Sequence, residues 1–136
     1  MLKVCNVNPE AMMFLKAGET ALVKGELVKF SSGTAIAAAA AHSGATILGV
    51  VAEDCAGGAT AKIYNVAGKE IEADIYQGGD TDAFTDANIG ALYDLIVASN
   101  DFKIDPNDTI GGFVVLSRYD SAQAKAWFRI PYTLLY

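Results

Sequence analysis

The side chains that most often carry catalysis are scarce in this sequence of 136 residues. Its single histidine, His42, stands beside Ser43 at the end of an alanine run. A nucleophilic triad needs a serine, a basic histidine and an orienting carboxylate within reach of one another, and many hydrolases place the serine in a Gly-x-Ser-x-Gly turn. The sequence contains no such turn, so His42 is predicted to be an ordinary loop residue.

Metal-binding and paired-carboxylate patterns are equally weak. One histidine and two distant cysteines fit no familiar zinc-site spacing. The acidic stretches Asp80-x-Asp82 and 101–108 do not resemble a twelve-residue calcium loop, and aspartate is common in turns. Adjacent Glu53 and Asp54 would point to opposite faces of a strand. Since no phosphate-binding glycine motif is present either, the sequence predicts no catalytic residue, no metal and no cofactor, and therefore a protein that is not an enzyme.

Composition argues against further classes of partner. Ten basic and sixteen acidic residues give a net charge of -6, which disfavours contact with nucleic acid and with anionic membranes. The apolar stretch Ala35–Ala52 resembles a membrane span in length, but it is mostly alanine and glycine, so no span is predicted. Asparagine, proline and glutamate in the first ten residues leave no signal-peptide core. Cys5 and Cys55 are expected to be buried thiols in a reducing compartment rather than a disulfide.

Alternating apolar residues and frequent glycines indicate strands. In Glu70–Tyr76 three apolar side chains alternate with acidic ones, which is typical of a half-buried strand with an acidic outer face. Ile47–Ala52 is a continuous apolar run, as in strands covered on both faces. The sequence therefore predicts a mainly β fold: a single small β-barrel or β-sandwich (β-tulip-like) with short helical segments at most. Residues 1–20 would form an N-terminal arm or first strand, and residues 21–136 one β-rich domain.

Turn residues predict how these strands are connected. Ala67-Gly68-Lys69 is predicted to join Ala61–Val66 and Glu70–Tyr76 into a hairpin, and the residues around Ser121 to join Gly112–Tyr119 and Lys125–Tyr132 into another. The remaining expectations are a strand or short helix at Ala91–Ala98, turns at Asp101–Thr109, an exposed loop at Gln77–Ile89, and a strand rather than a helix at Ala37–Ala41.

Both ends of the chain are unusually apolar. Chain ends are normally polar and frayed, so apolar ends are either packed into the protein's own core or bound to a neighbour. Methionine and tyrosine are frequent at contact surfaces, and both explanations stay open at this point. The candidate contact residues are Met12, Met13, Phe14 and Leu15 near one end, and Tyr132, Leu134, Leu135 and Tyr136 at the other.

One part of the sequence suggests a family. Gly25–Val28 reads Gly-Glu-Leu-Val, Leu48–Asp54 reads Leu-Gly-Val-Val-Ala-Glu-Asp, and Gly57-Gly58 then leads into Ala61–Tyr64. In this order the segment resembles the capsid decoration, or cement, proteins of tailed bacteriophages, and is similar to lambda-type head-decoration proteins. The pattern consists of glycines and apolar strands and covers less than half of the chain.

The resemblance implies a non-enzymatic structural protein of the virion. Such a protein is made in the host cytoplasm, binds the exterior of the capsid and stabilises contacts between major capsid protein subunits. It also implies a homo-oligomer, with a trimer favoured, and makes the eight terminal residues above the expected contacts to capsid or sister subunits.

Two other functions remain alternatives. One is a small β-barrel binding module for carbohydrate or for a receptor, in which Trp127, Tyr119 and Tyr132 would form an aromatic surface. The other is a structural component of another part of the virion, such as a tail tube or the base of a head fibre.

Overall fold

A computed structural model describes residues 1–39, 44–78, 83–98, 100–107 and 112–136. Within these ranges the chain is mainly β, as predicted, with short 3-10 turns as its helical segments. The elements are β1 (Lys3–Val4), η1 (Pro9–Ala11), β2 (Met13–Lys16), β3 (Leu27–Ser31), β4 (Thr34–Ala37), β5 (Ile47–Val51), β6 (Thr60–Asn65), β7 (Ile71–Ile75), η2 (Asp86–Asn88), β8 (Leu92–Tyr93), β9 (Leu95–Ala98), β10 (Asp101–Ile104), β11 (Val114–Asp120), β12 (Lys125–Arg129) and η3 (Tyr132–Leu134).

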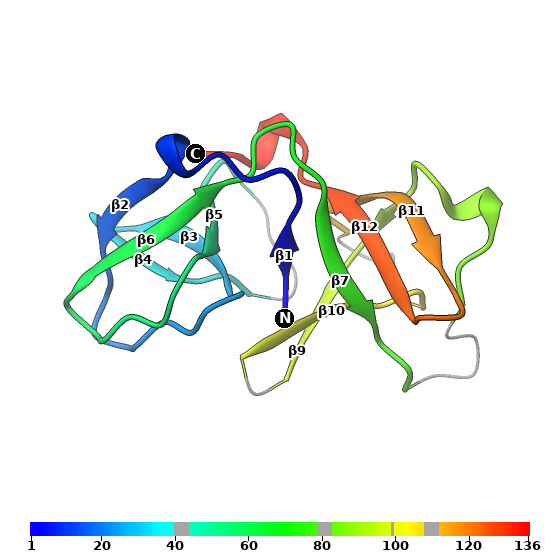
Figure 1. Cartoon of the computed structure of the whole chain (residues 1–136), viewed down its shortest axis with the longest axis horizontal. Coiled ribbons are helices and arrows are strands. Elements are labelled where there is room, and N and C mark those ends of the chain that lie inside the picture. Colours follow the sequence, from blue (N-terminus) through cyan, green and yellow to red (C-terminus); the bar gives the residue numbers. More distant parts are fainter. Residues whose placement is uncertain (40–43, 79–82, 99, 108–111) are drawn as a thin grey trace.

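The first sheet has the strand order β2-β6-β5-β3-β4 and forms one lobe of the molecule (Figure 1). A parallel bridge between Ala17 and Ala35 links its two outer strands, and the Gly18 N–H donates to the Ala35 carbonyl at 3.0 Å. The sheet therefore curls towards closure around an interior of small and branched apolar side chains. These are Ala17, Leu22, Val28, Ala35, Leu48, Val51, Ala61 and Ile63.

The second sheet forms the other lobe and is a nearly closed barrel. Its strand order is β8-β11-β12-β7-β10-β9, with β1 also paired to β7. The two ends of this path, β8 and β9, are separated along the chain by Asp94 alone, so the sheet bends back on itself. Its interior is filled by larger side chains, among them Phe102, Phe113 and Phe128, which are fully buried.

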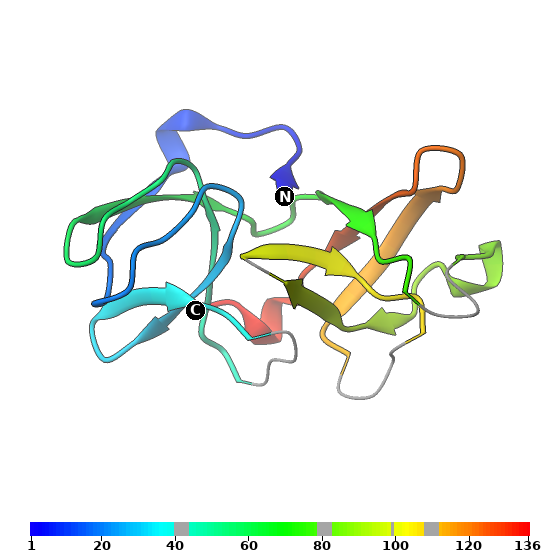
Figure 2. The same ribbon diagram turned by 90° about the horizontal axis from the view of Figure 1, so that it is seen from below.

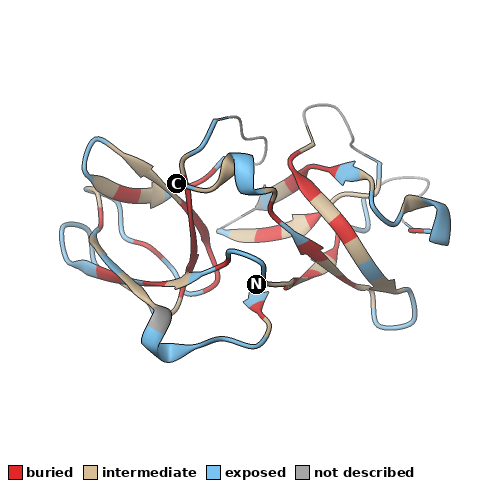
Figure 3. Ribbon diagram, turned by 90° about the horizontal axis from the view of Figure 1, so that it is seen from above, coloured by how far each residue is buried: buried red, intermediate tan, exposed pale blue. Residues whose placement is uncertain are grey.

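The chain ends connect the two lobes. β1 lies on the second sheet, with Lys3 opposite Glu72, whereas the following strand β2 belongs to the first sheet. At the other end the chain leaves β12 and returns to the first sheet, where the Tyr136 N–H donates to the Ile47 carbonyl at 2.9 Å (Figure 2). One hydrophobic cluster spans both lobes, and Val4, Val50 and Val66 belong to it together with the core of the second sheet. Buried residues therefore occur in both lobes (Figure 3), and this cluster joins them.

Several predicted strands are confirmed. β5 is buried along its whole length, and β7 alternates buried and half-buried residues as its sequence indicated. β11 and β12 form the expected antiparallel hairpin. Ala91–Ala98 contains two short strands and no helix. Of the run Ala37–Ala41, which was predicted to be a strand, only Ala37 lies in one, at the end of β4 (Thr34–Ala37); Ala38 and Ala39 are neither strand nor helix, and Ala40, Ala41 and His42 lie outside the described residues.

Two predicted connections are wrong. β6 and β7 do not form a hairpin: β6 pairs with β2 and β5, whereas β7 pairs with β1, β10 and β12. The apolar face of β6 enters the core of the first sheet and that of β7 enters the other, so the chain crosses between lobes at the buried Val66. Asp101–Ile104 is a strand rather than a turn, because pairing with β9 and β7 buries Phe102 and Ile104. Burial of two large side chains outweighs a local turn preference.

No helix in the described part of the chain is long and apolar enough to cross a membrane. Cys5 and Cys55 are free thiols, as expected, but each is half-buried rather than fully buried.

Candidate functional site

Apolar residues of β2 and the last residue of the chain meet at one end of the curled first sheet, which we call the first barrel. They border an apolar depression with a volume of about 330 Å³, which we call the barrel mouth. The residues that line it are Met13, Phe14, Leu15, Phe30, Leu48, Ile63 and Tyr136. Four of them were predicted as contact residues, and the structure brings these four together from opposite ends of the chain.

Side chains of β2 point alternately towards the interior of the first barrel and towards solvent. Met13 and Leu15 are half-buried against the interior of the first barrel, whereas the Phe14 side chain between them is 63% exposed. This follows from the alternation of side chains along a strand. Burial of Met13 and Leu15 thus holds the Phe14 ring out at the rim of the barrel mouth.

Successive backbone N–H groups of β2 also point in opposite directions. The Ala17 N–H donates to the Ala59 carbonyl, in line with the β2–β6 register, whereas the Gly18 N–H donates in the other direction, to Ala35. Since backbone groups alternate in direction along a strand, the odd-numbered residue Leu15 points its N–H to β6, and the even-numbered residue Lys16 points its N–H away from β6.

Tyr136 forms the opposite rim of the barrel mouth. Its ring stacks on Phe30 of β3, with the ring centroids 4.5 Å apart and an angle of 22° between the planes. The residue is nonetheless 70% exposed. Phe30, Leu48 and Ile63 were not predicted as part of a site.

The other predicted contact residues lie elsewhere. Met12 is half-buried at the end of η1, and Leu134 and Leu135 are half-buried against the cluster that spans the lobes. Tyr132 is 76% exposed and borders a separate depression of about 340 Å³ next to Arg129 and Pro131. Some residues of the apolar ends therefore pack inward, whereas Phe14, Tyr132 and Tyr136 remain exposed.

The three residues of the alternative aromatic surface do not form one platform. Trp127 lies across the β11–β12 ladder from Arg118, whose guanidinium carbon is 4.0 Å from the centroid of a Trp127 ring. Tyr119, the next residue on β11, faces the other side of the sheet, where its hydroxyl donates to Asp86 at 2.8 Å. This hydrogen bond raises the pKa of Tyr119.

Several carboxylates in the described ranges make structural contacts. Glu53 forms an ion pair with Lys62 at 3.1 Å, and Asp54 accepts the Lys24 backbone N–H at 2.8 Å. Lys125 forms an ion pair with Asp74 across the β7–β12 ladder, and its hydrogen bond lowers the pKa of Asp74. No group of three histidine, cysteine or acidic residues among the described residues is placed to hold a metal ion. Asp80, Asp82 and Asp108 lie outside these ranges.

Glu26 is the most buried carboxylate of the first barrel that the structure describes, with 2% of its surface exposed. Its Oε1 accepts the Val23 N–H at 2.8 Å, while its own N–H donates to the Val23 carbonyl at 3.1 Å. Burial raises the pKa of Glu26. The side chain thus closes the turn before β3, and its burial carries an electrostatic cost.

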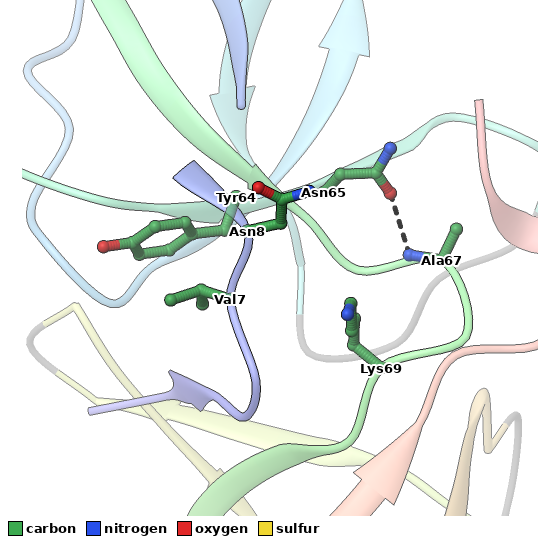
Figure 4. A pocket seen from close by; sticks show the side chains of 6 residues that line it. All are labelled: Val7, Asn8, Tyr64, Asn65, Ala67 and Lys69. Atoms are coloured by element: carbon green, nitrogen blue, oxygen red, sulfur yellow. Dashed lines mark hydrogen bonds between the residues drawn. The ribbon is translucent and has the colours of Figure 1, made fainter. Parts of the chain in front are cut away.

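A second surface lies where the N-terminal segment passes over β6 (Figure 4). It consists of two adjoining depressions of about 190 and 270 Å³, which share Val7 and Tyr64. In Figure 4 the Tyr64 ring lies beside Val7, and the Asn65 side chain accepts the Ala67 N–H at 2.9 Å. We call this surface the interlobe groove.

Comparison with protein-family models and with curated proteins found no match to this chain. Functional inference therefore rests on the residues, on their geometry and on the resemblance noted in the sequence of residues 21–76.

Proposed function

We propose that this chain is a non-enzymatic structural protein of a tailed-bacteriophage virion, which binds the capsid exterior and stabilises contacts between major capsid protein subunits. The observation that carries the proposal is the barrel mouth, where both chain ends expose aromatic side chains around an apolar depression. Large contiguous apolar patches on a protein surface often mark the place where a partner binds. The family resemblance of residues 21–76 supplies the class of partner.

Phe14 and Tyr136 would act as the anchors of this contact. Aromatic side chains dominate the energetics of protein interfaces when a partner removes them from water. An interface of ordinary size covers about 800 Å² on each partner, whereas the protein exposes 6952 Å². The surface thus has room for the barrel mouth to contact a capsid subunit and for other faces to contact sister copies in a homo-oligomer, with a trimer favoured.

Stabilisation of the shell would follow from mass action. A protein that binds the assembled lattice but not its separated subunits shifts the equilibrium towards the lattice. Such a role needs no catalytic group.

The direct test is to mix the purified protein with undecorated phage shells. We expect saturable binding and a gain in the resistance of the shells to heat and to chelator. Absence of both would reject the proposal. A solution mass corresponding to rings of six or more subunits would instead favour a tail component.

A further inference from the structure

The interlobe groove combines an apolar floor with a basic rim. Val50 and Val51, both buried, form part of its floor, and the half-buried Tyr64 forms a wall. Lys3 and Lys24 border one of its two depressions and Lys69 borders the other. These lysines come from three separate segments of the chain, which only the fold brings to one surface.

The side chains that line this groove carry a charge opposite to that of the whole protein, although Asp54 lies next to Lys24, and Asp74 and Asp101 pair with the Met1 ammonium group. The chain has sixteen acidic and ten basic residues, yet none of the described residues that line the two depressions is acidic. Glu72 lies opposite Lys3 in the β1–β7 ladder, but the ion pairs found within the described ranges include none of the three lysines. The Lys69 ammonium group donates to the backbone carbonyl of Asn6 at 3.0 Å and so stays at the rim.

We propose that the interlobe groove binds an extended acidic segment of a partner protein, with an apolar side chain between its carboxylates. The ammonium groups at the rim would pair with the carboxylates, and the floor beside Val7 and Tyr64 would take up the apolar side chain. Charge complementarity of this kind would let the groove attract an acidic segment, although the net negative charge of the whole protein repels acidic chains. The groove is separate from the barrel mouth, so the inference does not rest on the proposed function.

The test uses the intact protein and two synthetic peptides. The probe is acetyl-Gly-Glu-Val-Glu-Gly-Glu-amide, and its control carries glutamine in place of each glutamate. We expect the acidic peptide to bind, with an affinity that falls as salt is raised, and the glutamine peptide not to bind. Lys3→Gln, Lys24→Gln and Lys69→Gln together should weaken binding about tenfold, as expected for the loss of three exposed ion pairs.

A matched triple variant distinguishes binding in the groove from an effect of the protein's overall charge. Lys16→Gln, Lys62→Gln and Lys103→Gln remove the same charge at residues that do not line the groove and should leave the affinity unchanged. An equal loss of affinity in both triple variants would overturn the proposal, as would equal binding of the glutamine peptide. Full competition by inorganic phosphate at the peptide's concentration would likewise reject it, because it would indicate a site for simple anions.

Discussion

Replacement of Phe14 by serine tests whether this side chain at the barrel mouth contributes mainly to binding a partner or mainly to folding stability. The side chain is 63% exposed, so a little more than a third of its surface is buried in the free protein. Full burial of a phenylalanine contributes about 3 kcal/mol, so Phe14→Ser should cost about 1 kcal/mol of folding stability. For a protein of this size that corresponds to a fall of about 4 °C in Tm.

The effect on shell binding should be larger. If a capsid subunit buries the Phe14 ring, the ring becomes an interface anchor, and its truncation costs about 2 kcal/mol or more. The affinity for undecorated shells should then fall about 30-fold. The assay is a binding titration by sedimentation of shells with labelled protein, with thermal unfolding of the free protein measured in parallel.

Ile89→Ser provides the control, because Ile89 is an exposed apolar residue next to η2 on the second lobe. It should leave shell affinity unchanged. The reasoning is refuted if Phe14→Ser binds shells as tightly as the natural protein, or if Ile89→Ser weakens binding to the same extent.

Three further predictions concern the fold that holds these surfaces. Gly49→Ala should destabilise the protein by about 3 kcal/mol or more in urea unfolding, because an added Cβ would lie 1.9 Å from the Tyr64 carbonyl oxygen; an unchanged midpoint would contradict this close approach. Glu26→Gln should raise stability at pH 7 but not at pH 3, because the raised pKa means that the charged form opposes folding as pH rises above the carboxyl's ordinary range; an equal gain at both pH values would rule out charge burial as the cause. Leu15→Pro should abolish folding while Lys16→Pro is tolerated, as judged by circular dichroism, because only the first removes an N–H directed at β6; equal damage from both would refute the assigned direction of the β2 backbone.

Much of the secondary structure could be predicted because it is encoded locally. The alternation in Ile71–Ile75 and the continuous apolar run of Ile47–Val51 identify strands and their degree of burial before any partner strand is known. The β11–β12 hairpin could also be predicted, since its two arms are adjacent along the chain. The wrong predictions concern strands whose partners lie far away in the sequence. β7 pairs with β10 in parallel, and a parallel pair needs a long connection that has no turn signal of its own.

The candidate site could be predicted only in part. Apolar composition identified Phe14 and Tyr136, but it could not distinguish them from Leu134 and Leu135, which pack inward. Nothing local indicated that Phe30 would stack on the last residue of the chain. The lysines of the interlobe groove escaped notice because each is isolated in the sequence.

By itself the sequence determined which side chains share a face, because side chains alternate with a period of two along any strand. It also determined a net charge of -6 and a composition with a single histidine. Tertiary structure alone decided which of two cores each face enters, and hence that β2 and the last residue of the chain meet at the barrel mouth. The physical reason is that closing a longer loop costs only slightly more entropy than closing a short one. The choice of partner strand therefore depends on how much apolar surface the pairing buries, rather than on proximity along the chain.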